Sequence, residues 1–452
     1  MLALVLSVGP AAGGGSEVAS PTQAARVPEC ALLWTAATGP IRGSSELSVV
    51  DDVSGDGVSD LLVAEHGLRG PSDVALLDGG SGREFWRRRF EDRPTAPAVW
   101  TVLRHGPSVL VAHGDALSVI DARTGAAVRE MGLRAPIGEI AAAHLDTDGV
   151  PDVVYSAGSD RDDVLVALSG ADLSEIWTVA AGPDDSRFGN GFTRLTVRDL
   201  DRDGRDEVVV CENMRSVLVL SGDGAIVWKT ELAERTTYVP TGAVSGPPVL
   251  GDFLGGGLRQ LAVGLWAGTL VVVDPADGEI LAQRLFGVDT DAHRSLARNR
   301  RLPRFLKAIL TEAGEPINGL LALELDGVSG GEVVFGCSDG FVYAYSPRTD
   351  RILWSHDSLG QVFRAPVPVD ANDDGVPDVL AWDEEGVYLI DGRTGDPLEG
   401  FPPGASLSNA VLADLDRDGT VELIELRRDG SAHAFATGMT CARAPSAAGC
   451  VE

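Results

Sequence analysis

The sequence lacks the motifs that define many enzyme and membrane classes. Beyond the first few residues, no apolar run reaches the length of a membrane-spanning helix. Its 5 cysteines and 7 histidines form no Cys-x-x-Cys-His haem-attachment motif and no metalloprotease helix. Neither a phosphate-binding loop nor a nucleophile motif occurs. These absences exclude the enzyme classes that such motifs define, and we identify no catalytic residue.

Positive charge is also scarce. Lys229 and Lys307 are the only lysines, so arginine supplies nearly all of the 37 basic residues, against 67 acidic ones. The formal net charge of −30 repels nucleic acid phosphates and anionic membrane surfaces. We therefore expect no nucleic acid partner and no transmembrane segment.

Much of the acidity lies in a repeated nine-residue motif, Asp-x-Asp/Asn-x-Asp-Gly-x-x-Asp/Glu, followed by a short aliphatic run. Its copies begin at residues 52, 144, 199, 370 and 414, and each loop is named by that number. Side-chain oxygens at positions 1, 3 and 5, a backbone carbonyl at position 7 and a carboxylate at position 9 suit Ca²⁺, while Gly at position 6 permits the sharp turn. An EF-hand differs, because its last carboxylate is at position 12 and helices flank the loop.

The motif predicts calcium ligands in all of these loops. The predicted ligands are Asp52, Ser54, Asp56, Val58, Asp60, Asp146, Asp148, Val150, Asp152, Asp199, Asp201, Asp203, Arg205, Glu207, Asp370, Asn372, Asp374, Val376, Asp378, Asp414, Asp416, Asp418, Thr420 and Glu422. Loop 144 starts with His144 and should bind more weakly. The alternative is that the acids only cap turns by hydrogen bonds to the backbone. Two degenerate copies, loop 252 (252–260) and loop 324 (324–332), have lost too many oxygens and are predicted to be plain turns.

Each loop opens a repeated unit of strands. An alternating strand such as Val387–Asp391 follows, then a turn such as Arg393–Gly395, then a short strand often ending on Trp, as in Glu84–Trp86. With a shortened copy at Trp100–Val111, there are eight units of roughly 45–55 residues, a period typical of a propeller. We predict an all-β fold, an eight-bladed β-propeller, or a seven-bladed one if the shortened unit merges with a neighbour.

The last unit lacks a closing strand. Ala31–Trp34, near the N-terminus, has the same Trp ending as the other closing strands. We expect residues 31–36 to pair with the last alternating strand, Ala432–Ala436, because this would close the ring and remove two open sheet edges.

The acidic loops resemble FG-GAP (VCBS-type) repeats, as in integrin α-subunit propellers. The alternating strand, its turn and the closing Trp resemble the blades of quinoprotein (PQQ) propellers. The resemblance covers residues 30 to about 437. It implies a β-propeller whose loops bind calcium.

Outside the blades, residues 1–13 resemble a shortened secretory signal, 14–29 a linker and 442–452 a tail, with one propeller domain at 30–441. An insertion at 286–316 is predicted to be a basic amphipathic helix. Its basic residues are Arg294, Arg298, Arg300, Arg301, Arg304 and Lys307. They form either a docking site for an acidic protein or anionic glycan, or a helix whose arginines pair with carboxylates of the ring.

The cysteines allow a covalent lock. Cys30 precedes the N-terminal strand and Cys441 follows the last alternating strand, so a Cys30–Cys441 disulfide is our prediction, with Cys450 as a competing partner. The alternative is that the cysteines are free and act as small apolar residues.

We predict a monomeric, calcium-binding propeller, secreted, periplasmic or on the cell surface, that recognises a protein or glycan without catalysis. Millimolar Ca²⁺ outside cells suits weak loops of this kind. Two enzyme alternatives stay open. A polysaccharide lyase would need a Lys, Tyr or Arg base in a groove, and a quinoprotein dehydrogenase would need a quinone in the central funnel.

Overall fold

The computed structural model describes residues 30–37, 44–66, 71–92, 95–96, 98–133, 135–158, 163–182, 191–212, 216–232, 244–287, 317–328, 330–358, 365–382, 387–398, 407–427 and 429–441. Every regular element in these ranges is a β-strand, as the sequence predicts. The predicted signal and linker lie outside the described residues, as does nearly all of the basic insertion with its six basic side chains.

Most strands form six four-stranded antiparallel sheets. The first three are β2–β5 (Ser44–Val50, Asp60–His66, Ser72–Leu77, Glu84–Phe90), β6–β9 (Val99–Leu103, Gly106–His113, Ala116–Asp121, Ala127–Gly132) and β10–β13 (Ile137–Ala143, Asp152–Ala157, Val164–Leu168, Glu175–Ala180). The next three are β14–β17 (Phe192–Arg198, Glu207–Glu212, Ser216–Leu220, Ile226–Glu231), β18–β21 (Val249–Gly251, Gln260–Gly264, Thr269–Val273, Ile280–Leu285) and β22–β25 (Ile317–Leu323, Glu332–Cys337, Phe341–Ser346, Arg351–Asp357). The shortened unit thus forms its own sheet, β6–β9, and does not merge with a neighbour.

The remaining strands share one seven-stranded sheet. It contains β26 (Val367–Asp370), β27 (Asp378–Trp382), β28 (Val387–Ile390), β29 (Leu407–Ala413), β30 (Thr420–Arg427), β31 (Ser431–Cys441) and β1 (Ala31–Ala37). The long strand β31 joins its two halves, because its last residues pair with β26, Val369 opposite Cys441 and Asp370 opposite Thr440.

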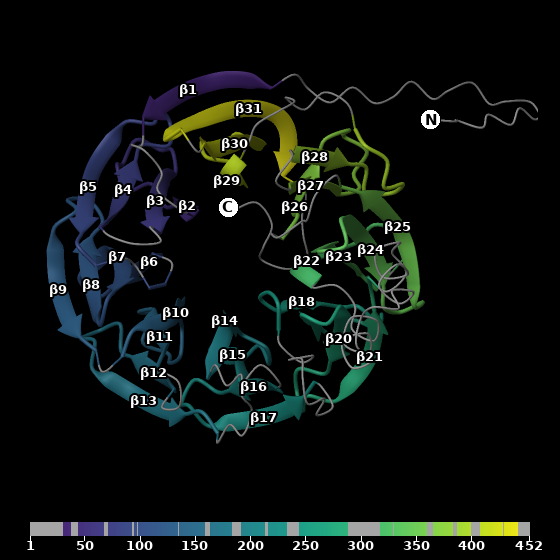
Figure 1. Cartoon of the computed structure of the whole chain (residues 1–452), viewed down its shortest axis with the longest axis horizontal. Helices are drawn as coiled ribbons and strands as arrows, with labels where there is room; N and C mark the ends of the chain where they lie inside the picture. The colour runs from purple at the N-terminus through teal and green to yellow at the C-terminus, as the bar shows by residue number, and fades with distance from the viewer. Residues whose placement is uncertain are drawn as a thin grey trace, which may run out of the picture.

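The sheets stand around a central axis as in a β-propeller (Figure 1). The first strand of each unit lies nearest the axis, and the last strands, such as β5, β13 and β21, lie at the rim. Middle strands such as β15 (Glu207–Glu212) are buried along their whole length, because neighbouring sheets cover both faces. Their continuous Val and Leu runs follow from this double burial. Within the described residues, no helix is long and apolar enough to cross a membrane.

The core lies between neighbouring sheets. One apolar cluster packs Leu62 and Val74 of the first sheet against Val109 and Ile120 of the second. An equivalent cluster packs Leu61 of the first sheet against Ile424 and other residues of β29–β31. The first and last units of the chain are therefore in contact through buried apolar side chains, and burial of such surface is the main favourable term in folding.

A tryptophan from the rim strand fixes each of several sheets to the next. The indole Nε1 donates a hydrogen bond to a carbonyl in the turn that follows the third strand of the next sheet. These pairs are Trp34–Gly79 (2.9 Å), Trp86–Ala122 (2.6 Å), Trp177–Gly222 (2.9 Å), Trp228–Pro275 (2.7 Å) and Trp354–Gly392 (2.8 Å).

The indole also lies on a glycine of the same turn. A Cβ added to Gly125 would lie 2.7 Å from Trp86, and one added to Gly395 would lie 2.8 Å from Trp354. The glycines predicted in these turns are thus required by the close approach of the ring. The sequence suggested that the rim strands often end on Trp, and this is not what the structure shows. They continue past it, as β5 does to Phe90.

The predicted N-terminal strand is confirmed. β1 pairs antiparallel with β31, from Ala31 opposite Ala436 to Ala37 opposite Ser431. Its Trp34 contacts the turn of the first sheet in the same way that the other tryptophans contact theirs. β1 therefore belongs to the last unit of the chain and also contacts the first sheet through Trp34.

Removal of residues 1–37 should destabilise the protein severely, whereas removal of residues 1–28 should not. The longer truncation deletes β1, exposes the edge of β31 and removes the Trp34 contact, and an open strand edge promotes aggregation. Calorimetry and size-exclusion chromatography of both truncations provide the measurement. Equally high and equally cooperative melting of the two would contradict this role of β1.

Candidate functional site

The acidic loops connect the first strand of a unit to its second. Loop 52 joins β2 to β3, and loop 414 joins β29 to β30. Because the first strands all lie near the axis, these loops occupy one face of the ring close to its centre, here called the loop face (Figure 1). Neighbouring loops are hydrogen-bonded from an amide at position 8 to a carbonyl at position 1 or 2. These bonds are Ser59–Leu415 (2.8 Å), Asp206–His144 (2.7 Å) and Gly331–Asp252 (2.6 Å).

Within a loop, the acids accept hydrogen bonds from the loop's own backbone. In loop 414, Asp414 accepts from the Gly419 amide (2.9 Å), Asp416 from the Asp418 amide (3.2 Å) and Asp418 from the Thr420 amide (2.7 Å). Gly419 has φ +93°, a conformation that L side chains rarely adopt. The turn-capping alternative is thus correct as a description of the loop, but it leaves further lone pairs of these carboxylates available to a ligand.

The side chain at position 9 holds the loop closed. It is buried and accepts a hydrogen bond from the amide at position 2. These bonds are Val53–Asp60 (2.8 Å), Leu145–Asp152 (3.3 Å), Leu200–Glu207 (2.8 Å), Phe253–Gln260 (2.7 Å), Leu325–Glu332 (2.9 Å), Ala371–Asp378 (3.0 Å) and Leu415–Glu422 (2.9 Å). Since the neutral Gln260 does the same, this structural role requires an oxygen but no charge.

The second oxygen at position 9 separates two kinds of loop. Where the residue is Asp, this oxygen accepts a further backbone amide from the turn after the third strand. The pairs are Gly79–Asp60 (3.4 Å), Gly170–Asp152 (2.9 Å) and Gly392–Asp378 (3.0 Å). Where the residue is Glu, the side chain is one methylene longer, and its second oxygen is free to face the other acids of the loop.

The acids converge in three loops. Atoms of Asp199, Asp201 and Asp203 lie within 4.8 Å of one another, as do atoms of Asp414, Asp416 and Glu422. The third set is Glu324, Asp326 and Glu332 of loop 324. Loop 324, which the sequence predicts to be a plain turn, thus brings three acids together as loops 199 and 414 do. Among the described residues, the acids of loops 52, 144 and 370 form no such set, although loop 370 keeps an oxygen-bearing side chain at positions 1, 3, 5 and 9.

Arginines neutralise part of this charge in some loops. Arg205 contacts Asp203 at 2.6 Å and Arg393 contacts Asp374 at 3.0 Å. Among the described residues, loop 414 has no arginine at ion-pair distance. The acid at position 5 therefore has a paired counter-charge in loops 199 and 370, whereas Asp418 of loop 414 has none among the described residues.

Burial and like charges shift the pKa values at position 9 upward. Burial, together with the nearby charges of Asp416, Asp418 and Asp414, raises the pKa of Glu422 to about 7. Burial likewise raises the pKa of Asp60 and Asp378 to about 6. At position 5, hydrogen bonds from Thr420 lower the pKa of Asp418 instead. The loops thus combine exposed acids that are charged with a buried acid whose charge is costly.

The predicted Cys30–Cys441 disulfide is not formed. Cys30 carries a free thiol, and burial raises its pKa to about 11. The strand register places Ala31 opposite Ala436, whereas Cys441 lies opposite Val369 on the other half of the sheet. At about 3.3 Å per residue, the two cysteines are separated by more than the roughly 7 Å that a disulfide spans.

Comparisons with known proteins agree with the fold. The PQQ_2 family model, described as outer membrane protein assembly factor BamB, matches residues 71–287. BamB from Moraxella catarrhalis superposes with TM-score 0.57 and 16% identity over 90% of this chain and 99% of that chain. No curated protein matches the sequence.

Two solved enzymes share the fold. The exotype rhamnogalacturonan lyase YesX gives TM-score 0.55 and 18% identity over 91% of this chain and 74% of that chain. The quinohemoprotein alcohol dehydrogenase ADHIIG from Pseudomonas putida HK5 gives TM-score 0.54 and 14% identity over 90% and 76%. Identities this low show the fold alone. Together, the family match and these structures support a PQQ-like β-propeller.

Proposed function

We propose that this protein is an exported, calcium-stabilised β-propeller that recognises a protein or glycan through its loop face. The observation that carries the proposal is loop 414. Its Asp414, Asp416 and Glu422 converge within 4.8 Å, and no arginine pairs with them among the described residues. A hard divalent cation with oxygen ligands satisfies this arrangement.

The electrostatics of the empty loop support the same conclusion. Glu422 is 6% exposed, and burial, with three other acids nearby, raises its pKa, so its charged form is unfavourable in the empty loop. A cation removes that repulsion and restores the charged form. Loop 199 would bind in the same way if Ca²⁺ displaced Arg205 from Asp203.

Recognition of a partner follows from which acids are exposed. In loop 414 the acids at positions 3 and 5, Asp416 and Asp418, are exposed, whereas position 9 is buried. An ion held there has its outward coordination positions open to hydroxyl or carboxylate groups of a glycan or protein. Export is proposed because weak calcium loops of this kind fill at the millimolar Ca²⁺ found outside cells. The BamB description of the matching family is compatible with a non-enzymatic role in the cell envelope.

We also propose that the ring has eight blades with FG-GAP-type loops. Six units are separate sheets, and the seven-stranded sheet contains two further sets of strands that only β31 connects. Counted in this way, β26–β28 and β29–β31 with β1 each form one blade.

A glycan array probed in Ca²⁺ and again in chelator tests the proposed function. Binding that requires Ca²⁺ supports it. Cleavage of a uronate polymer, or a quinone spectrum after addition of the cofactor, would favour the lyase or the dehydrogenase instead.

Chelation should lower the melting temperature by several degrees, and Ca²⁺ should restore it. With dissociation constants of about 10⁻⁴–10⁻³ M and millimolar Ca²⁺, each site adds about 0.4–1.4 kcal/mol. Glu422→Gln should weaken the response to Ca²⁺ and, at neutral pH in chelator, melt at or above the native chain, because Gln can still accept the Leu415 amide and carries no charge. Glu422→Ala, the control, should lose about 1–3 kcal/mol in either condition, since that buried amide loses its partner. Identical melting of the native chain with and without chelator would refute calcium binding.

In chelator, the stability that Glu422 contributes should fall as pH rises. Its pKa is about 4.5 in the unfolded chain and about 7 in the folded one, so the folded state binds more protons between these values. Its contribution is fully present below about pH 4.5 and is lost as pH rises through about 7. Because His433, whose pKa burial lowers, titrates in the opposite sense, the measurement is the difference between native and Glu422→Gln melting curves. A difference that does not change between about pH 5 and 8 would contradict the assignment.

A further inference from the structure

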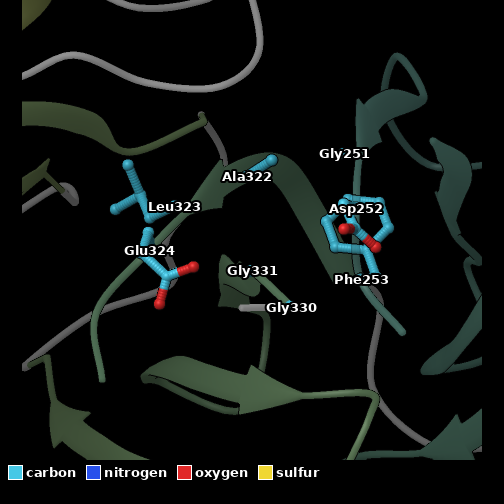
Figure 2. A pocket seen from close by; sticks show the side chains of 8 residues that line it. All are labelled: Gly251, Asp252, Phe253, Ala322, Leu323, Glu324, Gly330 and Gly331. Carbon is cyan, nitrogen blue, oxygen red and sulfur yellow. The ribbon is translucent and has the colours of Figure 1, made fainter. Parts of the chain in front are cut away.

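Loops 252 and 324 belong to neighbouring sheets and lie against each other. The Gly331 amide donates to the Asp252 carbonyl at 2.6 Å. A cavity of about 190 Å³ lies between them, bordered by Asp252 and Glu324 on opposite sides of Gly330 and Gly331 (Figure 2). This volume holds an ion with several waters, since liquid water occupies about 30 Å³ per molecule.

Three carboxylate oxygens of these loops are buried and accept no hydrogen bond from the backbone. They are Asp252 Oδ1 and Glu324 Oε1, whose residues border the cavity, and Glu332 Oε1, whose residue lies outside its lining. The Ser346 hydroxyl is a neutral donor to Glu332 and lowers its pKa only slightly against the effect of burial. Glu332 is 0% exposed, and it converges with Glu324 and Asp326 within 4.8 Å. Among the described residues, one other carboxylate oxygen shares this condition, Asp199 Oδ1. A buried charged oxygen with no donor is costly, so this arrangement points to a missing positive ligand.

The sequence explains why the second oxygen of Glu332 lacks a backbone donor. In the loops with Asp at position 9, a glycine amide such as that of Gly392 supplies the second hydrogen bond. The register of β23 with β24 places Pro347 at the equivalent position, after Ser346. Proline has no N–H, so it cannot satisfy the Glu332 carboxylate.

Arg348 compensates this charge only in part. Its guanidinium lies 3.8 Å from Asp326, farther than the arginine contacts of loops 199 and 370. Burial, with Asp326 and Glu324 nearby, raises the pKa of Glu332 to about 7. The single positive charge of Arg348 therefore faces several acids and does not balance them.

We propose that the paired loops 252 and 324 bind one hard divalent cation of the Ca²⁺ class. The ligands are Glu324, Asp326 and Glu332, and Asp252 faces the hydrated side of the ion. Ligand atoms on opposite sides of Ca²⁺ lie about 4.6–5.2 Å apart, which accommodates the 4.8 Å limit of this set. The ion links the β18–β21 sheet to the β22–β25 sheet, whose connecting chain at 286–316 is the longest between neighbouring sheets.

The test counts ions bound to the full-length protein. After removal of metals, Ca²⁺ alone is titrated by calorimetry into the native chain, Glu332→Gln and Asp326→Asn, with Mg²⁺ as competitor. Each variant should bind one Ca²⁺ fewer, or bind it at least 10-fold more weakly. Gln at position 9 keeps the loop closed, as Gln260 does in loop 252, and Asp326 is exposed, so its variant decides the question if Glu332→Gln does not fold.

Glu422→Gln separates this inference from the proposed function. If Glu422→Gln loses an ion but Glu332→Gln and Asp326→Asn bind as many as the native chain with equal affinity, the paired-loop site is wrong and calcium binding stands. If none of the variants changes binding, both fail. Melting adds an independent readout. Glu332→Gln should melt at or above the native chain in chelator, yet gain less from Ca²⁺, whereas a merely structural role would lower its melting temperature in both conditions.

Discussion

The arrangement of the whole loop face depends on the contact between a rim tryptophan and a turn of the next sheet. The indole lies against a glycine and donates to a nearby carbonyl, which fixes the distance and the rotation between two sheets. In the first sheet one residue of this turn makes two such contacts. The Gly79 carbonyl accepts Trp34 Nε1 and its amide donates to Asp60. Packing between sheets is thereby connected directly to the residue that closes an acidic loop.

This connection explains the chemistry of position 9. Asp60, Asp152 and Asp378 have both oxygens engaged by backbone amides, and they act chiefly as supports of their loops. Glutamate at the same position keeps the first of these bonds but extends one methylene further, and in Glu332 and Glu422 a carboxylate oxygen reaches two other acids of the loop. An acid at position 9 thus either supports its loop or becomes a candidate ligand. The difference depends on one CH₂ group in the side chain and on whether a backbone amide donates to its second oxygen.

The loop face concentrates negative charge near the axis of the ring. The exposed acids at positions 3 and 5 are solvated, which lowers the cost of keeping them charged without an ion. The buried acid at position 9 has no such relief, and in loop 414 it also lacks an arginine. Loops of one motif thus differ in their demand for a cation, because the surroundings rather than the motif set the electrostatic cost.

The sequence by itself determined the all-β repeat, the units of strands, the acidic loops with their glycines and the N-terminal strand beside Ala432–Ala436. These features are local or periodic, and alternation, turn residues and spacing record them. It could not show where the acid at position 9 joins the other acids of its loop, because that depends on the amide opposite position 9. That amide comes from a different strand and is absent where Pro347 stands. The convergence of Glu324, Asp326 and Glu332 likewise became apparent only in the tertiary structure, where two sheets also bring Glu324 and Asp252 to one cavity.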